Sequence, residues 1–200
     1  MAHRLEFYFD FSSPYGYLAG TRVDAVASRH GIAAEWRPFL LGAVFKLTNT
    51  VPLSSQLMKG DYMLRDVPRA ARRYGVPFVL PKQFPFGTVT ACRAFYHVAQ
   101  TDKAGAVRLG KALFHAAFGE GRDICPIEAV VAVAADAGFD PEAVFAGIQA
   151  PEVKSLLKQE VDEAISRQVF GSPFLFADGE PFWGNDRLDE ADLWLERGGW

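Results

Sequence analysis

The chain opens with a short strand that runs directly into a helix start, and this order constrains the fold more than any other feature. Apolar residues occupy every second position of residues 4–11, which is the period of a β-strand. Ser13 followed by Pro14 signals a helix start, because serine caps a first turn and proline suits the first helical position. Helical spacing continues to Gly31, and residues 32–37 predict a second strand. A right-handed β-α-β crossover makes the two strands parallel.

The middle of the chain carries almost only helical signals. The predicted helices cover residues 61–74, 88–101, 104–118, 126–137, 141–149 and 151–168. Strand character returns only at residues 174–176, where Asp178 and Gly179 predict a tight turn into a partner strand over 180–183. A last helix is predicted over 187–197.

These elements predict an α/β fold of the thioredoxin-like type, with the order β-α-β … β-β-α and a large inserted α-helical domain. Residues 1–38 and 168–200 would form the discontinuous thioredoxin-like domain, and residues 39–167 the insertion. The strand patterns alone would also allow other α/β folds, so the motifs have to decide.

Composition and residue spacing indicate which partners, location and metal sites to expect. The net charge is −3, from 21 basic and 24 acidic residues without a long basic run, so we expect no nucleic-acid partner. We expect no membrane span and no signal peptide, and the two cysteines suggest cytoplasmic residence with free, ordinarily packed thiols. Cys92 and Cys125 have no metal-ligand spacing, the four histidines form no HxH or HxxxH pattern, and we expect no metal site. The arginines at helical spacing over residues 65–73 are interpreted as a solvated face.

Three segments could carry chemistry. Ser13 stands where the first strand gives way to a helix, and a hydroxyl there can donate to a thiolate that the helix start also stabilises. Pro173, just before a buried strand, predicts a cis bond, so that Ser172 would offer its backbone N–H and C=O to an extended peptide. Residues 183–187 form a second strand-to-helix turn, suited to the two charges of an amino-acid end. Taken alone, each segment can equally be a helix cap or a loop proline.

Other signals are weaker or missing. Lys46, Asn49 and Lys59 lie early in the helical block, where a lysine can bind a carboxylate as a point charge but is usually just solvated. The sequence has no GxSxG elbow for an esterase, and no GxGxxG follows the first strand for a dinucleotide.

Six strings together give the chain a family resemblance. They are FYFDFSSPYGYLA at 7–19, RPFLLG at 37–42, YMLRD at 62–66, YGVP at 74–77, VFGSP at 169–173 and FWGNDRL at 182–188. In this order the chain resembles 2-hydroxychromene-2-carboxylate isomerases, and also kappa-class glutathione transferases and, more distantly, DsbA-like disulfide oxidoreductases. The resemblance implies a thioredoxin fold with an inserted helical domain, glutathione as cofactor and a homodimer.

The resemblance also implies roles for individual residues. Ser13 matches the serine that hydrogen-bonds the glutathione sulfur, and residues 13–16 stand where the DsbA-like relatives carry their redox CxxC. A dithiol mechanism is therefore excluded at this position, and the thiol has to come from outside. The remaining matches concern cofactor and substrate. Ser172 beside Pro173 would pair with the cysteinyl part of glutathione, Trp183 lies in the turn whose Asn185 and Asp186 hold the γ-glutamyl end, and Lys59 would reach the glycyl carboxylate. Lys46 and Asn49 would bind the substrate, although the match at Asn49 is shifted by one position.

The expected reaction is the isomerisation of a small aromatic carboxylate, of the type that converts 2-hydroxychromene-2-carboxylate to trans-o-hydroxybenzylidenepyruvate. Reversible thiolate addition, rotation about the former double bond and elimination would achieve it without net redox change. Two alternatives remain open: a kappa-class-like glutathione transferase that releases a conjugate, and a non-catalytic thiol-binding or chaperone-like protein.

Overall fold

The two ends of the chain meet in one four-stranded sheet, as the thioredoxin-like prediction expects. The computed structural model describes residues 3–200. The strands are β1 (Leu5–Phe9), β2 (Ala34–Pro38), β3 (Phe174–Ala177) and β4 (Glu180–Trp183), in the spatial order β2-β1-β3-β4. β1 pairs parallel with β2 and antiparallel with β3, and β3 pairs antiparallel with β4. The thioredoxin-like prediction, including its parallel first pair, is confirmed.

Helices fill the rest of the chain. They are α1 (Pro14–Gly20), α2 (Val23–Arg29), α3 (Leu41–Thr48), α4 (Lys59–Tyr74), α5 (Val89–Ala99), α6 (Lys103–Phe114), α7 (Ile127–Asp136), α8 (Pro141–Gln149), α9 (Pro151–Ser166) and α10 (Leu188–Arg197). Short 3-10 turns cover η1 (Leu53–Ser55) and η3 (Asn185–Arg187), and α6 continues into the π-helical turn η2 (His115–Gly119). Six helices predicted between residues 61 and 168, and the last one, lie within a few residues of these bounds.

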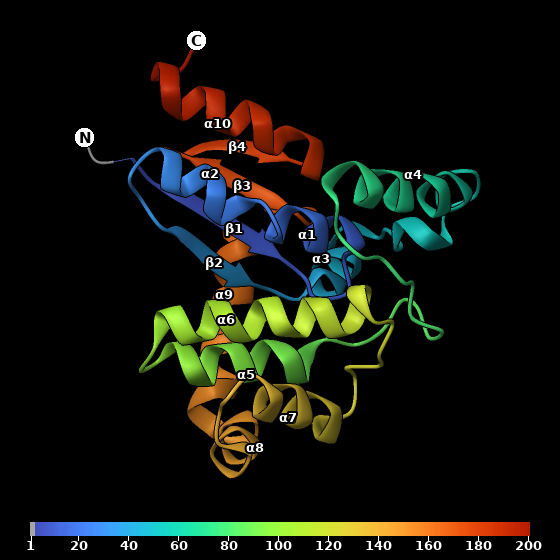
Figure 1. Ribbon diagram of the computed structural model, residues 1–200, viewed down its shortest axis with the longest axis vertical. Coiled ribbons are helices and arrows are strands. Elements are labelled where there is room, and N and C mark those ends of the chain that lie inside the picture. Colours follow the sequence, from blue (N-terminus) through green and yellow to red (C-terminus); the bar gives the residue numbers. More distant parts are fainter. Residues whose placement is uncertain (1–2) are drawn as a thin grey trace.

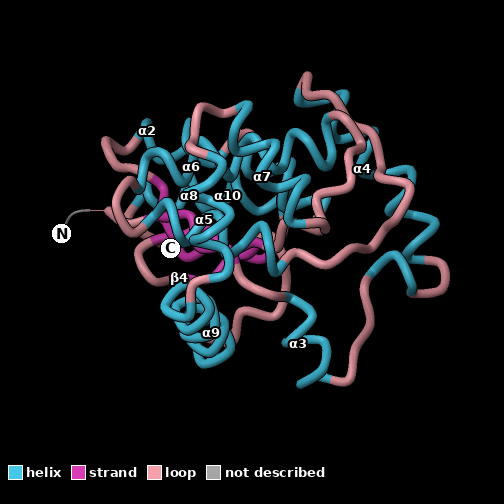
Figure 2. The backbone as a smooth tube through the Cα atoms, turned by 90° about the horizontal axis from the view of Figure 1, so that it is seen from below, coloured by secondary structure: helices cyan, strands magenta, loops and turns pink. Residues whose placement is uncertain are grey.

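Helices cover both faces of the sheet. In Figure 1, α5 to α8 lie beyond β2 at one edge of the sheet, and α10 lies next to β4 at the other edge. Figure 2 shows α9 alone below the sheet, opposite α2, α6 and α10. As a result β1 is buried on both faces: Phe7 and Phe9 pack on Trp36, and Tyr8 packs on Phe176 of β3. One continuous buried cluster joins the sheet to the helices of the middle region.

One prediction about the helices that follow β1 and β2 was wrong, and one helix was missed. The single helix expected up to Gly31 is broken into α1 and α2. Gly20 weakens the helix, and the hydroxyl of Thr21 donates to the Leu18 carbonyl at 2.7 Å, which favours a turn over a continued helix. Helix α3 was not predicted, because its N-cap, Leu40, has no capping side chain; instead the N–H of Leu41 donates to Asp10 at 2.8 Å, a residue far away in sequence.

Candidate functional site

Ser13 occupies the junction between β1 and α1, as its sequence position predicted. Its Oγ accepts a hydrogen bond from the N–H of Gly16 at 3.0 Å and so caps α1, with Pro14 at the first helical position. The same hydroxyl donates to the carbonyl oxygen of Ser172 at 2.8 Å. Ser13 is 8 % exposed, so its hydroxyl lies at the floor of the site and not on the open surface. Ser13 therefore caps α1 and also contacts the Ser172–Pro173 segment.

A buried carboxylate holds the turn that carries Ser13. Asp10, 3 % exposed, accepts hydrogen bonds from the N–H and hydroxyl of Ser12, the N–H of Leu41 and the hydroxyl of Thr88, all between 2.8 and 2.9 Å. Burial raises the pKa of Asp10, while the hydrogen bonds from Ser12, Leu41 and Thr88 act in the opposite direction. Asp10 thereby fixes the starts of α1, α3 and α5 around one point.

The Ser172–Pro173 segment lies directly against Ser13. The peptide bond between the two residues is cis, as predicted. The hydroxyl of Ser172 accepts from the N–H of Asp10 at 2.9 Å, and the carbonyl of Pro173 accepts from the N–H of Gly184 at 3.1 Å. Residues 162 positions apart in the chain are therefore joined at the floor of the site.

The turn after β4 adjoins the same segment. The indole of Trp183 lies over Gly171 and contacts Phe170, with ring centroids 4.9 Å apart. Asn185 is 5 % exposed and donates from Nδ2 to the hydroxyl of Tyr74 at 3.2 Å, while its Oδ1 has no hydrogen-bond partner among residues 3–200. The neighbouring Asp186 is exposed. A buried acceptor without a donor favours a ligand that brings an N–H group or an ammonium.

The three residues predicted from the helical block are not joined to Ser13. Lys46 lies on α3, Asn49 caps the end of α3 with a φ of 52°, and Lys59 begins α4. All three side chains are exposed, and within residues 3–200 no hydrogen bond or ion pair connects them to the floor of the site. Figure 2 shows α3 and its flanking loops running along the outside of the molecule. Their roles stay predictions.

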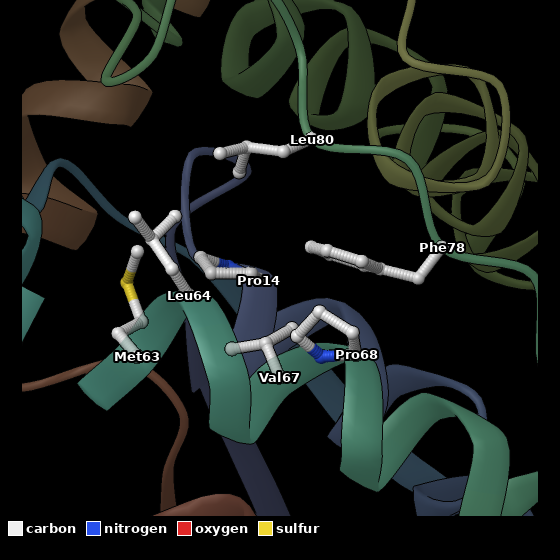
Figure 3. A pocket seen from close by; sticks show the side chains of 7 residues that line it. All are labelled: Pro14, Met63, Leu64, Val67, Pro68, Phe78 and Leu80. Atoms are coloured by element: carbon white, nitrogen blue, oxygen red, sulfur yellow. The ribbon is translucent and has the colours of Figure 1, made fainter. Parts of the chain in front are cut away.

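An apolar cavity of about 70 Å³ begins next to Ser13 at Pro14. Figure 3 shows Phe78 and Leu80 of the loop before α5 and, on α4, Leu64, Val67 and Pro68 facing the cavity. Its other lining residues are Pro14 and Met63. A space enclosed by aliphatic and aromatic side chains suits a flat apolar group.

The wall of this cavity is tied to α1 by a polar contact. The hydroxyl of Tyr15 donates to Asp66 of α4 at 2.8 Å, and Arg69 and Tyr62 also bond to that carboxylate. Burial, together with the hydrogen bond to Asp66, raises the pKa of the Tyr15 hydroxyl above its usual range. The contact fixes α4 against the residue that follows Pro14.

Sequence reasoning missed the cavity residues. The amphipathic spacing of α4 and the three prolines of residues 77–85 were visible, but they predict a helix and an irregular crossing, not which side chains meet. The structure also corrects one cysteine: Cys92 is buried as expected, whereas Cys125 is exposed. Burial, and then the charge of Asp10, raises the pKa of the Cys92 thiol, so Cys92 offers no thiolate to the site.

Within residues 3–200, no cluster of three or more His, Cys, Asp or Glu side chains has the geometry of a metal site, and no helix is long and apolar enough to cross a membrane. The site brings together one capping hydroxyl, a carbonyl beside a cis proline, a buried amide oxygen and an apolar cavity.

Comparison with known proteins places these features in context. Residues 4–195 match the family model of the DSBA-like thioredoxin domain. The chain is 32% identical over 197 residues to the 2-hydroxychromene-2-carboxylate isomerase of Sphingobium xenophagum, covering 98% of this chain and 99% of that protein. It is 26% identical over 206 residues to glutathione S-transferase kappa 2 of Caenorhabditis elegans, covering 96% and 92%.

A solved structure agrees with the sequence comparison. The fold superposes on a selenomethionine 2-hydroxychromene-2-carboxylate isomerase with a TM-score of 0.87 and 30% identity. The superposition covers 96% of this chain and 94% of that chain, so the helical region is shared along with the sheet.

Proposed function

Because the chain belongs to the 2-hydroxychromene-2-carboxylate isomerase family of DsbA-like thioredoxin-domain proteins, we propose that it is a glutathione-dependent isomerase. The observation that carries the proposal is the position of Ser13. Its hydroxyl lies beside Ser172 and the cis Pro173, in a segment without cysteine, and an apolar cavity begins at the next residue. The proposed site would therefore hold the sulfur of a bound thiol, because residues 12–16 carry no cysteine of their own.

The side chains present fit glutathione. The carbonyl of Ser172 can accept the cysteinyl N–H, and Asn185 offers its unpaired Oδ1 to the ammonium of the γ-glutamyl end. Asp186, exposed beside it, adds a negative charge for the same ammonium. Trp183 would cover the peptide from above, and Lys59 at the start of α4 would attract the glycyl carboxylate.

The proposed task of Ser13 is to keep the sulfur ionised. Helix α1 has only seven residues, so its dipole is small and a hydroxyl donor carries more of the stabilisation. When bound, glutathione supplies a thiolate that adds reversibly to an unsaturated carbon of the substrate and so allows rotation about the former double bond. The capping bond from Gly16 holds the hydroxyl oxygen in place throughout.

The cavity beside Ser13 supports an aromatic substrate, the class that the family resemblance implies. Its aromatic and aliphatic wall would hold the ring of an aromatic carboxylate of the 2-hydroxychromene-2-carboxylate type, and Lys46 with Asn49 would bind the carboxylate from α3. We also propose that the protein acts as a homodimer in the cytoplasm, as expected from the sequence and its family resemblance.

The test is an ultraviolet assay of 2-hydroxychromene-2-carboxylate with and without glutathione. We expect turnover only with glutathione, and a fall in kcat of about 100-fold in Ser13→Ala, because the donor to the sulfur is lost. Ser166→Ala is the matched control: the Ser166 hydroxyl also donates to a carbonyl, that of Glu163 at 2.8 Å, but it is exposed on α9. Equal turnover in Ser13→Ala and Ser166→Ala would remove Ser13 from the mechanism.

The similarity to a kappa-class protein supports a second candidate, a glutathione transferase. Both activities would use the same sulfur site, so the balance of glutathione separates them. Full recovery of glutathione beside an isomerised product indicates the isomerase, and stoichiometric loss of glutathione to a conjugate indicates the transferase.

A further inference from the structure

The hydroxyl of Ser13 already makes two hydrogen bonds within the protein, one as donor and one as acceptor. Its single proton points to the carbonyl oxygen of Ser172 at 2.8 Å, and its oxygen accepts the N–H of Gly16 at 3.0 Å. A hydroxyl has one proton to donate. In this arrangement the group assigned to the sulfur cannot donate to it, so the proton has to leave the Ser172 carbonyl first.

Leaving that carbonyl unpaired is unfavourable. Ser172 is partly buried and held on both sides, by the N–H of Asp10 on its own hydroxyl and by Gly184 on the next carbonyl. A carbonyl that is shielded from water and loses its donor is left with a desolvation penalty, and a partly buried carbonyl is left with part of it. The departure of the Ser13 proton is favourable only when another donor takes its place.

A peptide thiol brings that donor. In the proposed function the Ser172 carbonyl accepts the cysteinyl N–H of glutathione, and this is the same oxygen that now accepts the Ser13 proton. A carbonyl oxygen has two lone pairs, so the peptide N–H can bind before the Ser13 proton leaves. Only the proton has to turn, about the Cβ–Oγ bond of Ser13. The oxygen can stay where it is and continue to cap α1 through Gly16.

We propose that the bond between Ser13 and Ser172 is a latch that an amide N–H of the bound thiol opens. The hydroxyl of Ser13 remains on the Ser172 carbonyl until a peptide N–H replaces it, and then donates to the sulfur. The latch rests on the proposed function and deepens it. Ser172 is then a positioning residue, because its carbonyl makes the acidity of the bound thiol depend on an amide N–H of the same ligand. The site would therefore select thiols that carry a neighbouring peptide N–H over thiols without one.

The latch predicts opposite effects of one substitution on two ligands. In Ser13→Ala the Ser172 carbonyl has no partner to lose, so S-methylglutathione, which has no ionisable thiol, should bind about threefold to tenfold more tightly than it binds the natural protein. Glutathione has the same gain at the carbonyl, but its thiolate loses a charge-assisted donor that is worth more, so glutathione should bind about tenfold more weakly near pH 8.

Isothermal titration calorimetry with both ligands measures these affinities, and ultraviolet absorbance of the bound thiolate as a function of pH reports the pKa of the thiol. Ser13→Gly repeats the test with a residue that serves better than alanine as a helix cap, in case the alanine variant does not fold. Ser166→Ala should change neither affinity.

The latch would be overturned if the Ser13 variants bind S-methylglutathione as tightly as the natural protein does, or more weakly. Loss of an ordinary contact between Ser13 and the ligand would give that result. A bound thiol whose pKa is equally low without the Ser13 hydroxyl would overturn it as well. If neither ligand binds the natural protein, the proposed function fails and the latch with it; binding of both without the opposite shifts refutes the latch alone.

Discussion

At the scale of single residues, Asp10 is the side chain on which the geometry of the site most depends. Its Oδ1 accepts from Ser12 and Thr88, and its Oδ2 accepts the N–H of Leu41. In Asp10→Asn, one position becomes an NH₂ group that faces a donor. We expect a loss of about 2 kcal/mol in the free energy of unfolding, since a buried donor is left without an acceptor. Urea denaturation of the purified protein measures the loss.

The control is an exposed aspartate on a helix. Among residues 3–200, Asp162 of α9 pairs only with Lys158 one turn away, and its side chain is 59% exposed. Asp162→Asn should change stability by less than about 0.5 kcal/mol, as surface pairs usually do. Equal losses in the two variants would mean that the Asp10 hydrogen bonds add nothing beyond an ordinary surface contact.

At the scale of elements, the sequence predicted what local patterns determine. The positions of the strands along the chain, the long helices and the cis bond at Pro173 follow from periodicity, caps and proline placement. Helix α3 could not be predicted, because its capping group is Asp10 at the end of β1. The bond between Ser13 and Ser172 was hidden for the same reason: sequence places each residue at a turn, but only the antiparallel pairing of β1 with β3 brings the turns together.

The absence of a side chain at Gly171 leaves room for the indole of Trp183, a candidate binding residue at the end of β4. A Cβ at Gly171 would lie 2.1 Å from Nε1 of Trp183, so Gly171→Ala has to displace the indole. Trp183 is 57% exposed and can swing into water, so the loss of stability should stay below about 1 kcal/mol. The affinity for glutathione should fall by about threefold to tenfold if the indole covers the ligand.

Calorimetry and urea denaturation together check this prediction. Gly42→Ala is the matched control, because Gly42 lies on α3 with open space around its Cβ position. It should leave glutathione affinity unchanged and raise stability slightly through better helix propensity. A Gly171→Ala protein with natural affinity would show that Trp183 takes no part in binding.

At the scale of the whole molecule, one buried glutamate links the sheet to the helix behind it. Glu6 of β1 accepts from Arg167, which follows α9, at 2.6 and 2.8 Å, and from Arg37 of β2 at 3.0 Å. Arg37 in turn bonds to Glu160 on α9 at 2.9 Å. Burial alone would raise the pKa of Glu6, but the hydrogen bonds and charges of the arginines outweigh it, and the pKa is lowered.

The lowered pKa fixes the sign of the acid response. A carboxyl group whose pKa is lower in the folded state stabilises the fold above its unfolded pKa of about 4.5, and this stabilisation is lost as the pH falls through the folded value. Glu6→Gln should therefore lower the free energy of unfolding at pH 7 by about 2 kcal/mol. This loss is smaller than for a fully buried pair, because the arginines are partly exposed. Below pH 5, the free energy of unfolding of Glu6→Gln should fall less steeply than that of the natural protein. Urea denaturation from pH 3 to 7 measures both, with Glu196→Gln, at an exposed glutamate that makes no ion pair with residues 3–200, as control. Parallel pH profiles for the natural protein and Glu6→Gln would show that the pairing of sheet and helix does not depend on this charge.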